Sequence, residues 1–290
     1  MLPMIEARDL CKAYEGFSLG KVSLTLSAGA ILGVFGPNGA GKTTLIKILA
    51  GQFAADAGEL RLFQLGYAEN EREIKDRIGY CPQEPPYYPD YTLVENARFA
   101  SSFYSRWDGA MLYGLLERFR ISPYKRFRLL SPGQRTLFSL ALALCHHPDL
   151  LLLDEPAAGL DDANRRFLLG TLRDFTAGGD KAVLISSHVS DGLDEVAEQV
   201  LFIGGGAALL CADKEDLLAR WKWVHFRDRA LTAALAARLT AISRHPFGSA
   251  GLCSDFPALR PELAEAIAAG DVRVENARLS DVLIHLTQGG

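Results

Sequence analysis

Apolar residues along this chain follow two patterns, short continuous runs and longer stretches with helical spacing. The runs at 150–153 and 182–186 are bounded by turn residues, which predicts strands buried on both faces of a sheet, and 30–35 is a further β-like segment. Between the runs at 150–153 and 182–186, residues 162–175 place apolar side chains at the spacing of a helix. A strand, a helix and a strand in this order predict a right-handed βαβ unit, and therefore a parallel sheet.

The middle of the chain differs from the first part, which opens with β-like segments at 5–10 and 22–26. A proline-rich loop at 84–89 cannot be helical. Helix-like stretches follow at 93–103, 110–119 and 134–145. We interpret residues 85–147 as a helical insertion within an α/β domain.

The pattern changes again towards the C-terminus, where no motif stands out. Helix-like stretches at 231–239 and 263–269 alternate with short apolar runs such as 272–274. We therefore expect a large domain over residues 1–213 and a small α+β accessory domain over 214–290.

Composition narrows the possible classes of protein. With 49% hydrophobic and 23% charged residues among 290, the chain is not wholly disordered. A net charge of −4 argues against a general nucleic-acid binder, so no nucleic-acid partner is expected. No apolar run approaches the roughly 20 residues that span a bilayer, and no secretory pattern opens the chain, so we expect a soluble, cytoplasmic protein. The cysteines are odd in number and far apart in the sequence, which fits neither a disulfide framework nor a zinc cluster and predicts buried, reduced thiols. They are Cys11, Cys81, Cys145, Cys211 and Cys253.

A phosphate-binding loop is the first motif that carries chemistry. Residues 36–43 match the pattern G-x-x-x-x-G-K-[ST], after an apolar run and before a helix-like stretch at 42–50. The glycines allow backbone N–H groups to point at phosphate oxygens, Lys42 supplies a cation, and Thr43 supplies a hydroxyl for Mg²⁺. The expected nucleotide-binding residues are Gly36, Pro37, Asn38, Gly39, Ala40, Gly41, Lys42, Thr43 and Thr44.

Two carboxylates, Asp154 and Glu155, end the apolar run at 150–153. Buried carboxylates are costly unless a cation meets them, so Asp154 is expected to hold Mg²⁺. Glu155 would then orient and deprotonate water beside the γ-phosphate. A helix N-cap is the alternative interpretation of this pair, and the phosphate-binding loop favours the catalytic one.

The segment Leu-Ser-Pro-Gly-Gln-Arg at 130–135 resembles the LSGGQ signature of ATP-binding cassette (ABC) ATPases. Four further residues stand where that family places its other motifs: Tyr14, Gln83, Asp161 and His188. These motifs occur in the family's order over residues 4–212. The resemblance implies a P-loop NTPase core with a mostly parallel sheet, an antiparallel N-terminal β subdomain, an inserted helical subdomain and a small α+β extension.

The resemblance also implies a role for each of these residues. Tyr14 would stack on adenine, Gln83 would reach Mg²⁺ and the attacking water, and His188 would hydrogen-bond the γ-phosphate. The signature would contact ATP held by a second subunit, through Ser131, Gly133 and Gln134, with Asp161 at the subunit interface. The expected assembly is a homodimer, or a pair with a related ATPase chain, that sandwiches two ATP molecules.

The signature departs from its common form at Pro132, which replaces a glycine. Proline has no N–H, so one donor to phosphate would be lost while the helix N-terminus remains. We expect a working but weaker ATP contact.

The partner implied by the resemblance is a separate transmembrane permease. The run at 186–198 looks like that of prokaryotic ABC-2-type exporter ATPases. Exposed aromatics at Tyr87 and Tyr88, just after Gln83, would face this permease and keep the chain peripheral on the inner face of the membrane. The alternative is a soluble ABC ATPase that acts on a ribosome, DNA or an assembly complex.

Overall fold

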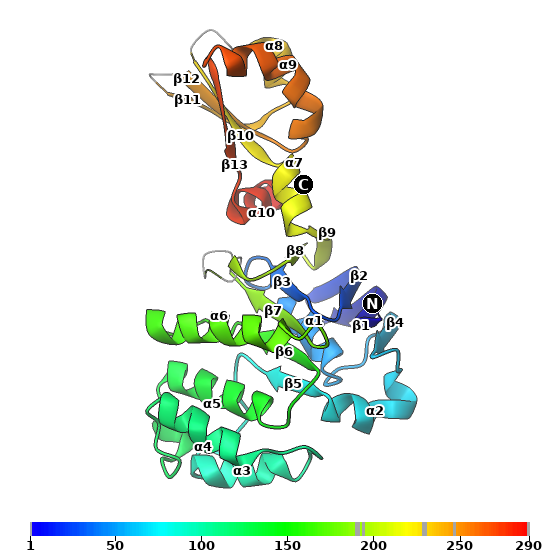
Figure 1. The fold of residues 1–290 in the computed structure, drawn as a ribbon. Coiled ribbons are helices and arrows are strands. Elements are labelled where there is room, and N and C mark those ends of the chain that lie inside the picture. The colour runs from blue at the N-terminus through cyan, green and yellow to red at the C-terminus, as the bar shows by residue number, and fades with distance from the viewer. Residues whose placement is uncertain (1, 189–191, 193–194, 228–230, 246–247, 289–290) are drawn as a thin grey trace. The chain divides into compact units, whose positions relative to one another are not determined.

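The computed structural model describes residues 2–188, 192, 195–227, 231–245 and 248–288 (Figure 1). The chain divides into two compact units, Met1–Cys211 and Ala212–Gly290. None of the helices in the described ranges is both long and apolar enough to cross a membrane.

A six-stranded sheet forms the centre of the first unit, in the order β5-β6-β7-β3-β8-β9 (Figure 1). The strands are β3 (Ile31–Phe35), β5 (Ile78–Cys81), β6 (Leu150–Asp154), β7 (Ala182–Ser187), β8 (Gln199–Gly204) and β9 (Ala207–Asp213). The neighbours from β5 through β8 pair in parallel, which confirms the predicted parallel sheet.

The sheet is covered on both faces, which explains its continuous apolar runs. Leu151 and Leu153 of β6 belong to one buried cluster, with the helices α4 (Gly109–Arg118), α5 (Pro132–Leu144) and α6 (Asp162–Thr176). Leu150 and Leu152 belong to the other, with α1 (Lys42–Leu49) and strands of a second sheet described below. Successive side chains of a strand point to opposite faces, so all four leucines are fully buried.

A second, antiparallel sheet of the same unit has the order β2-β1-β4. Its strands are β1 (Pro3–Tyr14), β2 (Phe17–Ser27) and β4 (Ala57–Leu62). This arrangement confirms the expected antiparallel N-terminal subdomain.

Five helices of the first unit occupy predicted positions, whereas α2 (Tyr67–Asp76) was not predicted. The five are α1 (Lys42–Leu49), α3 (Leu93–Ser101), α4 (Gly109–Arg118), α5 (Pro132–Leu144) and α6 (Asp162–Thr176). Thr92, Asp108, Ser131 and Asp161 cap α3 to α6 with side-chain oxygens, which satisfies free N–H groups of the first turns. Helix α6 connects the parallel neighbours β6 and β7, as the βαβ prediction requires.

The second unit is an α+β fold with a four-stranded antiparallel sheet, in the order β11-β12-β10-β13. Its elements are α7 (Lys214–Arg220), β10 (Lys222–Phe226), α8 (Ala233–Ala236), β11 (Thr240–His245), β12 (Gly248–Cys253), α9 (Phe256–Ala268), β13 (Val272–Asn276) and α10 (Leu279–Gln288). From β10 to β13, these elements form a β-α-β-β-α-β arrangement of two interleaved βαβ units.

Two helix predictions in this unit were wrong in extent. Helix α8 covers four residues instead of 231–239. Backbone hydrogen bonds of a turn, from the N–H of Arg238 and Leu239 to carbonyl oxygens three residues earlier, end it, and Leu239 packs in the core. Helix α9 begins at Phe256 rather than 263, because Pro257 in its first turn needs no N–H partner.

The cysteine prediction holds for three of the five residues. Cys81, Cys145 and Cys253 are buried, whereas Cys211 is exposed and Cys11 is half-buried, and all five are free thiols. Cys11 and Cys211 lie on β1 and β9, whose side chains there are only partly covered.

Candidate functional site

The loop between β3 and α1 is built for close approach to a phosphate. A Cβ at Gly36 would lie 2.2 Å from the carbonyl oxygen of Ile203, so only glycine fits there. Gly41 caps α1 with a φ of +110°, a conformation that glycine adopts without strain. The N-terminus of α1 therefore points its free N–H groups into the loop.

Residues from five sequence segments line one pocket of about 530 Å³ beside this loop. They are Phe17, Asn38, Gly39, Ala40, Gly41, Lys42, Thr43, Thr44, Gln83, Glu155 and His188. Gln83, Glu155 and His188 follow the carboxyl ends of β5, β6 and β7. Ligands bind at this edge of open parallel sheets.

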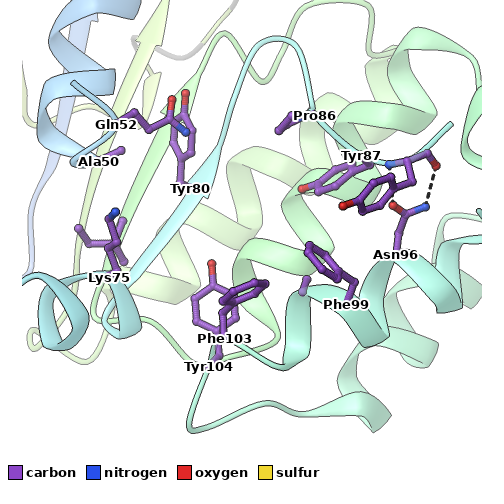
Figure 2. A pocket seen from close by; sticks show the side chains of 13 residues that line it. Ala50, Gln52, Lys75, Tyr80, Pro86, Tyr87, Asn96, Phe99, Phe103 and Tyr104 are labelled. Carbon is purple, nitrogen blue, oxygen red and sulfur yellow. Dashed lines mark hydrogen bonds between the residues drawn. The ribbon is translucent and has the colours of Figure 1, made fainter.

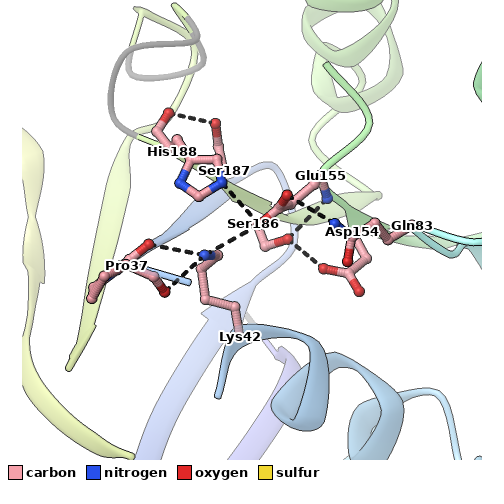
Figure 3. Close-up of polar contacts among 9 residues, drawn as sticks. Pro37, Lys42, Gln83, Asp154, Glu155, Ser186, Ser187 and His188 are labelled. Atoms are coloured by element: carbon pink, nitrogen blue, oxygen red, sulfur yellow. Dashed lines mark hydrogen bonds and ion pairs between the residues drawn. The ribbon is translucent and has the colours of Figure 1, made fainter. Parts of the chain in front are cut away.

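Lys42 lies at the floor of the pocket and is almost fully buried. Its Nζ donates hydrogen bonds to the carbonyl oxygens of Gly36, at 2.9 Å, and Pro37, at 3.3 Å. It also lies 3.2 Å from Oε1 of Glu155, in a buried ion pair (Figure 3). The ammonium group is thus held by acceptors that an incoming phosphate can replace.

Glu155 is the point where the predicted catalytic residues meet (Figure 3). Its Oε1 lies 3.4 Å from Nε2 of His188, and its Oε2 accepts a hydrogen bond of 3.1 Å from Nε2 of Gln83. The backbone of Glu155 has a φ of +50°, in the left-handed region that a side chain rarely adopts. The structure therefore brings Lys42, Gln83 and His188 around one carboxylate.

Asp154 is buried at the end of β6, and its Oδ1 accepts a hydrogen bond of 2.7 Å from Oγ of Ser186. Its Oδ2 is buried and, among the described residues, has no hydrogen-bond partner. Burial raises the pKa of Asp154, the hydroxyls of Ser186 and Thr43 oppose this shift, and the neighbouring Glu155 adds to it. A buried oxygen without a donor, beside the hydroxyl-bearing Thr43, fits a hard divalent cation such as Mg²⁺.

Two residues of this site, Ser186 and Phe17, were not predicted from the sequence. Ser186 contacts both Asp154 and the backbone of Glu155, and its place at the end of an apolar run was a signal for it. Phe17 lines the phosphate pocket, and no sequence signal marked it. Tyr14 is not among the pocket-lining residues; its ring is half-exposed and stacks with Phe17 at a centroid distance of 6.5 Å.

The signature residues are not among those that line the pocket beside the phosphate loop of the same chain. Ser131 caps α5, because its Oγ accepts a hydrogen bond of 3.3 Å from the N–H of Gln134. In return, Oε1 of Gln134 accepts a hydrogen bond of 3.3 Å from the N–H of Ser131. The same Oε1 accepts a hydrogen bond of 3.1 Å from Nζ of Lys125. Pro132 is the first residue of α5, where the helix itself requires no N–H.

A second pocket, of about 490 Å³, adjoins the signature. Its lining includes Gln83, Glu155, Pro132, Arg135 and Gly159. A Cβ at Gly133 would lie 2.6 Å from the carbonyl oxygen of Gly159, so the signature packs closely on the segment that precedes Asp161. Asp161 itself is exposed, and its Oδ1 caps α6 by accepting from the N–H of Asn164 at 2.8 Å.

An apolar groove of about 430 Å³ lies beside the segment that follows Gln83 (Figure 2). It is lined by Ala50, Gln52, Lys75, Ile78, Tyr80, Pro86, Tyr87, Tyr88, Asn96, Phe99, Ala100, Phe103 and Tyr104. Asn96 holds the backbone of Tyr88 through hydrogen bonds to its N–H, at 2.9 Å, and its carbonyl oxygen, at 3.1 Å. Tyr88, Phe99 and Phe103 are exposed by 47%, 50% and 67%.

The prediction that Tyr87 is an exposed aromatic was wrong. Its ring packs edge-on against Phe127 and Phe138, and its hydroxyl lies 3.2 Å from Oγ of Ser139. Neighbouring residues of an extended segment point in opposite directions, so Tyr88 faces outward where Tyr87 faces inward. The run at 186–198 lies partly outside the described residues, at 189–191 and 193–194.

Comparisons with known proteins agree with this geometry. A family model described as ABC transporter matches residues 19–158. The chain is 33% identical over 215 residues to the ABC transporter ATP-binding protein YtrB of Bacillus subtilis, which covers 74% of this chain and 73% of the relative. It is 29% identical over 227 residues to the linearmycin resistance ATP-binding protein LnrL of the same organism, covering 75% and 71%.

A further relative is the Nod factor export ATP-binding protein I of Ralstonia nicotianae, 29% identical over 225 residues, which covers 74% of this chain and 69% of the relative. Among solved structures, an ATP-binding subunit of an ABC transporter has a TM-score of 0.67 at 24% identity, covering 74% of this chain and 92% of that chain. A dimeric, post-hydrolysis ATP-binding cassette with ADP and phosphate has a TM-score of 0.62 at 20% identity, covering 72% and 98%.

Proposed function

Because the chain belongs to the ABC transporter ATP-binding proteins and is an ATP hydrolase, we propose that it powers export through a separate membrane permease. ATP-driven closure of a dimer would be the moving step, with each signature on the nucleotide of the other subunit. Relatives named for Nod factor export and linearmycin resistance support the outward direction. The chain would then lie at the inner face of the membrane through its partner.

The apolar groove is the observation that carries this proposal. Three aromatic side chains, Tyr88, Phe99 and Phe103, remain exposed around a hollow whose lining is mostly apolar. A contiguous exposed apolar surface of this kind is typical of a protein interface. Pro86, Tyr87 and Tyr88 line the groove and come shortly after Gln83 in the chain. Since Gln83 donates a hydrogen bond to Glu155, a permease segment docked in the groove would be connected to Glu155 through one short loop.

The site supports a simple scheme for hydrolysis. Water attacks the γ-phosphorus, its proton passes to Glu155, and the bond from that phosphorus to the bridging oxygen of ADP breaks. Lys42 and the loop N–H groups hold the phosphates, while Gln83 and His188 orient the carboxylate and the γ-phosphate. Asp154 and Thr43 would hold Mg²⁺, which would supply positive charge to neutralise the phosphate oxygens.

Nucleotide contacts outside the pocket complete the proposal. Adenine would stack on Tyr14 and Phe17, and Ser131, Gly133 and Gln134 would meet the nucleotide of the partner subunit. Pro132 of the signature lines a different pocket from the one beside its own phosphate loop, which supports this division of labour between two chains. Residues 214–290 would form a separate accessory domain.

A capture experiment tests the permease partner. The full chain carrying Glu155→Gln, loaded with ATP and Mg²⁺, is used to retain partners from gently solubilised membranes of its source. We expect one polytopic membrane protein in stoichiometric amount, and we expect Phe103→Glu to lose it while ATP binding persists. Tyr124→Glu is the matched control, because Tyr124 is 73% exposed and lies outside the groove. Recovery of only soluble partners would contradict the proposal and favour a soluble ABC ATPase.

A further inference from the structure

Ser186 occupies a central place between the two carboxylates of the site, although it does not line the phosphate pocket. It lies on β7, directly across from Asp154 in the parallel register of β6 and β7, and it is fully buried. Its Oγ donates to Oδ1 of Asp154 at 2.7 Å and accepts from the N–H of Glu155 at 2.9 Å (Figure 3). One hydroxyl is thus shared by two consecutive acidic residues.

The hydrogen bond to Asp154 determines which oxygen of its carboxylate is available to a cation. Since Oδ1 is engaged by Ser186, the available atom is Oδ2, which is buried and, within the described ranges, unpartnered. A carboxylate that ligates a metal is commonly held in this way by a hydrogen bond to its other oxygen. Without the hydroxyl, the side chain of Asp154 would be free to turn.

The second hydrogen bond holds the backbone of Glu155. That residue has a φ of +50°, which costs free energy for a non-glycine residue unless the surroundings maintain it. The N–H of Glu155 is anchored by Ser186, and from this anchor the side chain reaches Lys42, His188 and Gln83. The direction of the carboxylate therefore depends on the same hydroxyl.

We propose that Ser186 is a positioning residue for ATP hydrolysis, whose single hydroxyl sets both the cation-facing oxygen of Asp154 and the backbone of Glu155. The inference rests on the roles proposed above for these two carboxylates. Ser186 is not a catalytic residue, since it acts through Asp154 and Glu155. Loss of its hydroxyl should weaken metal binding and slow turnover together, without weakening metal-free nucleotide binding.

The test compares Ser186→Ala and Ser186→Thr with the wild-type full chain. The measurements are kcat, KM for ATP, ATP affinity in EDTA, and binding of Mn²⁺ to the protein–ATP complex by electron paramagnetic resonance. For Ser186→Ala we expect kcat to fall and the Mn²⁺ dissociation constant to rise, each about 10–100-fold, as is typical for residues that orient metal ligands. ATP affinity in EDTA should not fall, because Lys42 keeps its bonds to the carbonyl oxygens of Gly36 and Pro37 and a displaced Glu155 competes less for its ammonium group. Thr176→Val is the control, because it removes another buried hydroxyl, on α6, outside the pocket.

The second variant separates a lost hydrogen bond from lost packing. Ser186→Thr keeps the hydroxyl and suits a strand, so it should restore kcat and Mn²⁺ binding to within a few-fold of the wild type. If Ser186→Ala matches the wild type in both readouts, or if Thr fails as badly as Ala while remaining folded, the inference is wrong. If Ser186→Ala does not fold, a folded Ser186→Cys variant, with its weak S–H donor, must show the same losses. A wild-type chain that fails to hydrolyse ATP would instead overturn the proposed function.

Discussion

The buried ion pair between Lys42 and Glu155 predicts that Glu155→Gln binds nucleotide more tightly than the wild type when no metal is present. Nζ and Oε1 lie 3.2 Å apart, and both side chains are at least nine-tenths buried. ATP must break this pair, because its phosphates need the same ammonium group. The substitution removes the competing carboxylate and also its repulsion towards the phosphates.

The magnitude follows from the distance. Two unit charges at this separation attract by about 5 kcal/mol at an effective dielectric constant of about 20. Desolvation offsets much of this attraction, and a hydrogen bond to a charged group contributes about 1.5–3 kcal/mol net. Since Lys42 keeps its bonds to the carbonyl oxygens of Gly36 and Pro37, we expect ATP affinity to rise roughly 10–100-fold.

The assay is calorimetric or fluorescence titration of ATP into the full chain in EDTA, paired with thermal unfolding. Without nucleotide, Glu155→Gln should unfold at a lower temperature, because a buried cation has lost its partner. ATP should raise the unfolding temperature of the variant more than that of the wild type. Glu84→Gln is the control, because Glu84 lies one residue after Gln83 and forms no ion pair with Lys42. Equal or weaker ATP binding by Glu155→Gln in EDTA would refute the reasoning.

Three further predictions concern single residues of the site. Lys42→Ala should weaken ATP binding at least about tenfold, because the phosphates lose a charge-assisted contact, and unchanged binding in a nucleotide titration would count against the phosphate-loop assignment. Pro132→Gly should strengthen ATP-dependent dimerisation measured by light scattering, since it restores an N–H at the start of α5; no change would mean that this donor makes no contact. Burial raises the pKa of Asp154 in the folded protein, so its stabilising contribution is present at low pH and is lost as pH rises through that pKa. Asp154→Asn should therefore raise the unfolding temperature in EDTA at pH 7–8, with a gain that shrinks as pH falls, and a gain independent of pH would contradict this reasoning.

Features that depend on neighbouring residues in the chain were predictable. The phosphate loop is defined by glycines at 36, 39 and 41 followed by Lys42, and its backbone conformation follows from those residues. The buried strand β6 and the carboxylates at its end were visible because continuous apolar residues require cover on both faces. The βαβ unit followed from the spacing of these elements, since connections of this kind have one hand.

Features that depend on contacts across the fold were not predictable. Gln83 donates to Glu155 from 72 positions away, and Ser186 meets Asp154 because the register of β6 and β7 places them side by side. Tyr87 and Tyr88 differ in exposure because Phe127 and Phe138 provide a packing site for only the first ring. Helix α8 ended early because burial of Leu239 outweighed the helical spacing of 231–239. Local patterns indicate which conformation a segment favours. Strand register and packing determine which side chains meet, and both depend on residues far apart in the chain.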